Sequence, residues 1–234
     1  MVPHNEPVTV TEETAPAPPQ RRRRRSPWFW IGIGLMAAGL ALLGWLAWLF
    51  FGTTYVAHRD QRHVVQLFEK GEQLSNVEAV VRIPRFGSDY AVPVYEGVGA
   101  DVLARGFGHF TSSAGPGEVG NYALAGHRVT HGEPLRHMPD LRPGDRVVIE
   151  THTERYVYVL DTDPNALIVP FTAGWVLEPH PSNPNDGPQP PVDQTRLITL
   201  TTCSEIFHTD NRMIAFGHLL STRRLHRTTP HPLP

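Results

Sequence analysis

The sequence predicts a mostly β external domain, either a closed β-barrel or a sandwich, preceded by one transmembrane helix. Between residues 76 and 220, short runs rich in β-branched and aromatic residues alternate with Gly/Pro-rich turns, which is typical of many short strands. The 23 prolines and 20 glycines among 234 residues argue against a helical bundle. Residues 28–51 contain no charged side chain. These features divide the chain into a membrane part and a β part.

The N-terminal region predicts a single-pass membrane anchor. Residues 1–27 are a Pro/Thr/Glu-rich segment, expected to be disordered, that includes five consecutive arginines, Arg21 to Arg25. The 24 residues of the apolar run 28–51 would span about 36 Å as a helix, enough for a hydrocarbon core and too long for a signal-peptide core. Arginines before the span place the N-terminus in the cytoplasm and residues 52–234 outside the cell. A net charge of −2 argues against a general nucleic-acid binder.

The external part is expected to begin with a stalk and to continue into one β domain. Residues 52–75 carry a weak helical stripe and predict the stalk. Residues 76–220 form the predicted domain, and 221–234 a tail. The Pro/Asn-rich stretch 171–195 is a long loop, of the kind that is usually functional or mobile. Strands are predicted at 77–84, 90–95, 120–128, 196–203 and 212–220, a hairpin within 140–170, and one or two helical turns at 99–106.

Cys203 is the only cysteine, and it ends the predicted strand 196–203. It cannot form an intramolecular disulfide, and a free thiol outside the cell is exposed to oxidation. A buried core cysteine is the alternative reading. As a nucleophile the thiol needs a nearby base or cation. His127 ends one strand and Arg212 opens another, so together they supply an acid/base and an oxyanion stabiliser. His208 and His131 compete with His127 for the first of these roles.

A metal site is not predicted. His127 and His131 have the i, i+4 spacing of helical metal ligands, but the glycines and β-branched residues around them disfavour a helix, and Arg128 stands where a glutamate is expected. Asp210 and Glu205 are too few oxygen donors for calcium. We therefore expect no metal and no cofactor.

The stretches TLTTC (199–203) and AGHR (125–128), followed by Arg212, resemble the signature of sortases. These are membrane-anchored cysteine transpeptidases of Gram-positive bacteria, and the chain is most similar to the actinobacterial class E enzymes. The resemblance covers about residues 76–220 and implies an eight-stranded sortase-type β-barrel with short helices.

The resemblance also implies a reaction. Cys203 would attack the Thr–Gly bond of a C-terminal sorting signal of the LAxTG or LPxTG type and form a thioacyl enzyme. His127 would protonate the leaving glycine amine and then help to deprotonate the incoming amine. Arg212 would stabilise the tetrahedral oxyanions. The acceptor would be an amine of a peptidoglycan precursor, so that surface proteins become anchored to the cell wall. Thr202 would contact the substrate or order the thiol, and the loop 171–195 would read the signal.

Two other functions remain open at this point. The domain could be an extracellular β-barrel binding module in which Cys203 is inert. It could also be a cysteine peptidase that uses water as the acceptor. An assay with a fluorogenic LAxTG peptide separates the first reading from an enzyme, and full cleavage by the Cys203→Ala variant would rule out Cys203 as the nucleophile. Product mass after addition of a glycine-like amine would separate hydrolysis from transfer.

Overall fold

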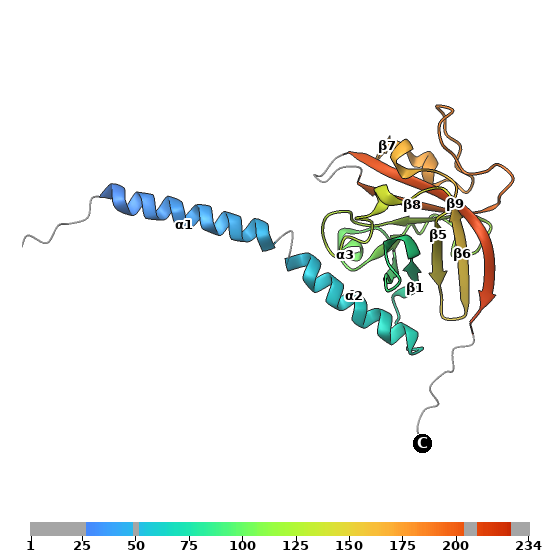
Figure 1. Cartoon of the computed structure of the whole chain (residues 1–234), viewed down its shortest axis with the longest axis horizontal. Coiled ribbons are helices and arrows are strands. Elements are labelled where there is room, and N and C mark those ends of the chain that lie inside the picture. Colours follow the sequence, from blue (N-terminus) through green and yellow to red (C-terminus); the bar gives the residue numbers. More distant parts are fainter. Residues whose placement is uncertain (1–26, 49–51, 204–209, 226–234) are drawn as a thin grey trace, which may run out of the picture. The chain divides into compact units, whose positions relative to one another are not determined.

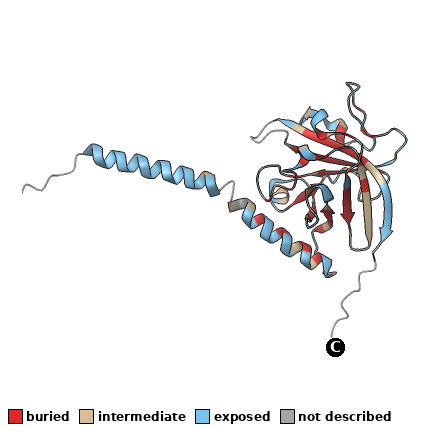
Figure 2. Ribbon diagram, viewed as in Figure 1, coloured by how far each residue is buried: buried red, intermediate tan, exposed pale blue. Residues whose placement is uncertain are grey.

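The computed structural model describes residues 27–48, 52–203 and 210–225, with the side chains of Thr53 and Cys203 excepted. The helix α1, Pro27–Ala47, is apolar along its whole length, and every residue in it is exposed or nearly so (Figures 1 and 2). Its 21 residues are long and apolar enough to cross a membrane. Residues 49–51 of the predicted anchor, and the predicted disordered segment up to residue 26, lie outside the described residues.

Eight strands close into a barrel, which confirms the predicted architecture. Their order around the ring is β6-β5-β1-β2-β3-β4-β8-β9, and pairing of β9 with β6 closes it (Figure 1). A ninth short strand, β7, pairs with the free side of β9. The strands are β1 Val77–Arg82, β2 Val92–Glu96, β3 Phe107–His109, β4 Gly120–Ala125, β5 Arg146–Glu150, β6 Glu154–Leu160, β7 Ile168–Pro170, β8 Arg196–Cys203 and β9 Asn211–Arg224.

The last strand makes the closure possible because it is long. The first half of β9 pairs with β8, from Arg212 to His218, and the second half pairs with β6, from Gly217 to Arg224. The strand therefore extends four residues into the predicted tail 221–234. A closed ring leaves few unpaired strand edges, and the pairing of β9 with β6 closes this one.

The barrel interior is filled by alternate residues of the strands. Successive side chains of a strand point to opposite faces, so every second position faces inward. On β4 these are Tyr122 and Leu124, on β8 Ile198 and Leu200, and all are essentially inaccessible to solvent. Figure 2 shows the buried positions gathered along the strands of the barrel. This core is the rigid support from which the strand ends present functional groups.

The helix α2, Thr53–Glu69, occupies most of the segment predicted as a stalk, and one of its faces packs on the barrel. Val65 and Phe68 are buried against Val77 and Tyr95 of the first two strands. The helix ends at Glu69 with Lys70 as its C-cap, and the following Gly71 has a φ of 84°. The amide of Gly71 donates to the Phe68 carbonyl and that of Glu72 to the Leu67 carbonyl, the pattern of a Schellman cap.

The other helical elements are short. The helix α3, Ala100–Leu103, falls in the segment predicted to form one or two helical turns. The 3₁₀ turns are η2 Pro84–Phe86, η3 Met138–Asp140, η4 Pro164–Ala166 and η5 Gly174–Leu177. Of these, η5 lies in the predicted long loop 171–195 and contributes to the candidate site.

Candidate active site

The strand register brings the three predicted catalytic positions to one end of neighbouring strands. β4 runs parallel to β8, with Ala125 opposite Thr201, and the Gly126 amide continues the pairing by donating to the Thr201 carbonyl at 3.1 Å. Two residues beyond the Ala125–Thr201 pair, the two neighbouring segments of the chain reach His127 and Cys203. β9 runs antiparallel to β8, and its Arg212 pairs directly with Cys203. The barrel thus assembles, at the backbone level, residues that are far apart in sequence.

Thr202 ties two of these strands together. It is 3% exposed, and its hydroxyl donates to the Gly126 carbonyl at 2.7 Å. The bond joins the residue before Cys203 to the residue before His127. It satisfies a buried carbonyl beyond the last ladder pair, where a missing partner would be costly. Thr202 therefore has a defined role in holding the strand ends in register.

Arg212 and His127 both line a pocket of about 350 Å³ at these strand ends. The Arg212 guanidinium donates from Nη1 to the carbonyl of Asn211 at 3.0 Å. Most of the wall is apolar, and Phe171, which is 61% exposed, stands at its rim. The pocket is lined by residues of β4, β8 and β9 and of three other segments: Val98 and Leu103, Phe110, and Val169 to Leu177. A mostly apolar wall of this kind suits apolar ligand groups.

The loop after His127 is tightly curled. His131, Gly132 and Glu133 all have positive φ, at 55°, 80° and 46°. The ring of His131 stacks on that of His127, with centroids 5.1 Å apart and planes at 29°. The two histidines are therefore not on a helix, the setting in which their spacing would suit a metal. The side chain of Gln61, 3% exposed on α2, approaches this loop and donates to the His131 carbonyl at 3.5 Å.

Of the two predicted competitors of His127, His131 lies beside it, whereas His208 lies outside the described residues. Glu205, considered above as an oxygen donor, also lies outside them. Trp175 of the loop 171–195 packs on Phe216 with ring centroids 5.9 Å apart and covers the outer face of the barrel.

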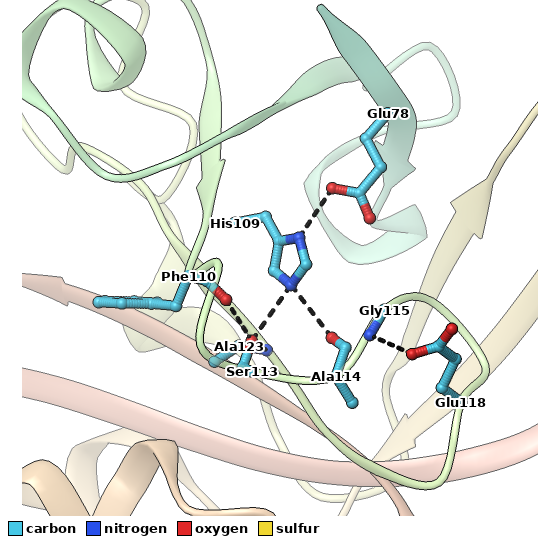
Figure 3. A network of polar contacts seen from close by, with 8 residues as sticks. All are labelled: Glu78, His109, Phe110, Ser113, Ala114, Gly115, Glu118 and Ala123. Atoms are coloured by element: carbon cyan, nitrogen blue, oxygen red, sulfur yellow. Dashed lines mark hydrogen bonds and ion pairs between the residues drawn. The ribbon is translucent and has the colours of Figure 1, made fainter.

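A second polar cluster, which sequence reasoning missed, lies on β3 and the loop after it (Figure 3). His109 is 8% exposed, and its Nδ1 lies 2.9 Å from the Glu78 carboxylate. Its Nε2 lies 3.1 Å from the Ala114 carbonyl and 3.2 Å from the Ser113 hydroxyl oxygen. The three residue types resemble a serine–histidine–carboxylate triad.

The hydrogen bonds rule out that chemistry. Ser113 donates its hydroxyl hydrogen to the Phe110 carbonyl at 2.8 Å and accepts from the Ala123 amide at 3.2 Å, so it has no hydrogen for the imidazole. A carbonyl on one side of His109 and a carboxylate on the other require N–H donors at both ring nitrogens. Burial lowers the pKa of His109, but the hydrogen bond and charge of Glu78, with smaller effects of the Ala114 carbonyl and Glu96, raise it above 6.5 overall. The acceptors at both ring nitrogens and the raised pKa favour the protonated imidazolium of His109, which bridges Glu78 and the Ala114 carbonyl, over the neutral form that a general base requires.

Comparison with known proteins places the fold in one family. A sortase domain model matches residues 81–220, and the chain belongs to the sortase family. Sortases are cysteine transpeptidases. Among curated relatives, sortase SrtE1 of Streptomyces coelicolor is 37% identical over 177 residues, which are 71% of this chain and 46% of that protein. Sortase SrtE2 of the same organism is 30% identical over 118 residues, 50% of this chain and 44% of that protein.

Solved structures agree with this assignment. Sortase E from Streptomyces avermitilis is 38% identical with a TM-score of 0.55, over 65% of this chain and 93% of that one. Sortase E1 from Streptomyces coelicolor, solved with a tripeptide in its active site, is 33% identical with a TM-score of 0.54, over 67% and 94% of the two chains. The chain spans about half the length of the curated relatives it matches.

Proposed function

We propose that this protein is a membrane-anchored cysteine transpeptidase that cleaves a C-terminal LAxTG- or LPxTG-type sorting signal between Thr and Gly and transfers the carried protein to an amine of a cell-wall precursor. The observation that carries the proposal is the register of β4, β8 and β9, which aligns His127, Cys203 and Arg212 in a chain of the sortase family. No cofactor is needed for this chemistry.

In the first half-reaction the Cys203 thiolate attacks the carbonyl carbon of the signal threonine. A carbon–sulfur bond forms, and the carbonyl oxygen becomes an oxyanion that the Arg212 guanidinium stabilises. The intermediate then collapses and breaks the carbon–nitrogen bond, while the His127 imidazolium gives its proton to the departing glycine amine. The products are a thioester on Cys203 and a neutral His127.

In the second half-reaction the acceptor amine attacks the thioester carbon. His127 takes a proton from that amine, the carbon–sulfur bond breaks, and the Cys203 thiolate is released. A new amide bond joins the protein to the precursor. Water in place of the amine gives hydrolysis, so the apolar pocket around the thioester favours transfer to the extent that it excludes water.

The test is cleavage of a fluorogenic LAxTG peptide by the full-length protein in detergent. Cys203→Ala should abolish cleavage and thioester formation, and His127→Ala and Arg212→Ala should each lose most of the activity. His137→Asn is the control and should keep full activity, since His137 is exposed and does not line the pocket. Full activity of Cys203→Ala would overturn the nucleophile assignment, whereas a wild-type protein that cleaves no sorting peptide would favour a binding module.

A glycine-like amine added to the same assay separates transfer from hydrolysis. A transpeptidase should yield the amide of that amine as the main product, identified by mass. If only the free acid of the peptide forms at saturating amine, the protein is a peptidase.

The membrane anchor is a separate part of the proposal, and the composition makes it simple to test. Cys203 is the only cysteine in the chain. A membrane-impermeant maleimide applied to intact cells should label it if residues 52–234 lie outside. The double variant Ser26→Cys, Cys203→Ala should be labelled only after lysis. The reverse pattern would show that the domain faces the cytoplasm.

A further inference from the structure

A buried polar pair lies on the outer face of the barrel beneath the long loop. Asn121 of β4 and Thr199 of β8 are both fully buried. Their neighbours Tyr122 and Ile198 belong to the barrel core, so alternation directs Asn121 and Thr199 outward. Buried polar side chains on an outer face need partners, and here the partners come from the loop 171–195.

Asn121 holds that loop through its backbone. Its Nδ2 group donates two hydrogen bonds, to the carbonyl of Val176 at 3.0 Å and to the carbonyl of Glu178 at 3.1 Å. Its Oδ1 accepts from the Thr199 hydroxyl at 2.8 Å. The Thr199 oxygen also lies 3.3 Å from the Val176 carbonyl, but its single hydrogen can serve only one acceptor at a time, and the contact to Asn121 is the shorter. Both donor hydrogens of the Asn121 amide are therefore used.

The segment that is held forms one wall of the candidate active site. Val176 and Leu177 of η5 line the same pocket as His127 and Arg212. Val176 is 6% exposed and packs in an apolar cluster with Ile214 on the outer face. The η5 wall is therefore held in two ways: the Val176 side chain packs in an apolar cluster, and the Asn121 amide binds the backbone carbonyls.

We propose that Asn121, supported by Thr199, is a positioning residue for peptide recognition, because it fixes the η5 wall against which the sorting signal lies. The inference rests on the proposed function and deepens it. Asn121 does not line the pocket itself, so it acts through the loop on substrate affinity. The chemistry at Cys203 should be little affected.

The chemical requirement at position 121 is specific. Aspartate has the same shape but would turn a carboxylate oxygen toward two carbonyl oxygens, so both loop bonds would be lost and replaced by repulsion. Alanine would leave the carbonyls of Val176 and Glu178 without their donor. Serine at position 199 keeps the hydroxyl, whereas valine there keeps the shape and removes it.

The experiment compares kcat and KM for a sorting-signal peptide in the full-length protein. Asn121→Ala and Asn121→Asp should raise KM about tenfold, the effect of losing one to two buried hydrogen bonds, with kcat within about twofold. Thr199→Val should raise KM less, and Thr199→Ser should restore it. Amide hydrogen exchange across residues 174–178 should be faster in the Asn121 variants.

Asn183 is the matched control in the same loop. It is 8% exposed and bonds the Asn185 amide and the Pro188 carbonyl, but neither it nor these partners line the pocket. Asn183→Ala should leave KM unchanged. An equal rise in KM for Asn183→Ala would overturn the specific role of Asn121.

Four further results bear on the proposal. Unchanged exchange and KM in Asn121→Ala would overturn it, and so would a fall in kcat at constant KM. If Asn121→Ala does not fold, the Thr199→Val and Thr199→Ser pair decides, since equal KM values in the two would overturn the proposal. If the wild-type protein cleaves no sorting peptide, the proposed function fails, whereas hydrogen exchange still tells whether Asn121 holds the η5 segment.

Discussion

The Thr202 hydroxyl donates to the carbonyl oxygen of Gly126 at 2.7 Å, and the two residues are 76 positions apart in the sequence. Each immediately precedes one of the proposed catalytic residues. The bond therefore couples the position of Cys203 to that of His127 through two short stretches of backbone.

We expect Thr202→Val to lower kcat/KM about tenfold, because it keeps the shape and leaves the buried Gly126 carbonyl without a donor. Thr202→Ser, which keeps the hydroxyl, should retain most of the activity. Steady-state cleavage of the sorting peptide measures both. Equal activity of the valine and serine variants would show that the bond has no part in catalysis.

The clamp made by His109 and Glu78 predicts a pH-dependent stability. Because the pKa of His109 is raised in the folded protein, its stabilisation is fully present below about pH 6.5 and is lost as the pH rises through the folded pKa. Thermal unfolding midpoints measured between about pH 6 and pH 9 should fall for the wild type. His109→Gln should show a smaller fall over the same range. Parallel curves for the two proteins would refute a charged His109.

The helix α2 is predicted to belong to the folded domain. Phe68→Ala empties a fully buried position against the barrel and should lower the free energy of unfolding by about 3–5 kcal/mol. Tyr55 on the same helix is 69% exposed, and Tyr55→Ala should change stability by no more than about 0.5 kcal/mol. Chemical denaturation of the two variants checks this. Equal stability would mean that the helix is a detached stalk.

Phe171 is predicted to contact the sorting signal, since it stands exposed at the rim of the pocket. Phe171→Ala should raise KM about tenfold, in line with about 1.4 kcal/mol for part of an aromatic contact. Val192 is 78% exposed in the same loop and does not line the pocket, so Val192→Ala should leave KM unchanged. Identical KM values for these two variants would remove Phe171 from the signal-reading surface.

Much of the fold follows from local pattern. The strand predicted at 196–203 has the same bounds as β8, and the predicted hairpin appears as β5 and β6 joined by a polar turn. These segments are rich in β-branched or aromatic residues and are bounded by polar turn residues, so the local sequence predicts their conformation. Two three-residue strands, Phe107–His109 and Ile168–Pro170, were not predicted. Three residues are too few to show the two-residue alternation of a strand. These segments become strands only because they pair with neighbouring strands.

In the candidate site, too, some features follow from local sequence and others only from the tertiary structure. Cys203, His127 and Arg212 were predicted from their motifs and order, and the structure adds that their strands are neighbours. The Asn121 anchor and the His109 clamp were not predicted. Each depends on a partner that is 31 to 78 residues away and carries no motif.

By itself the sequence determined the apolar helix, the strand-rich domain and a lone cysteine in a sortase motif, because each depends on composition, period or short spacing. Only the tertiary structure decided that β4 lies parallel to β8, that β9 closes the ring on β6, and that the η5 wall rests on Asn121. The physical reason is that long-range pairings are selected by the packing of the whole core against the entropy of loop closure, which no local stretch of residues specifies. The single cysteine supplies the thiol, and the barrel supplies its neighbours.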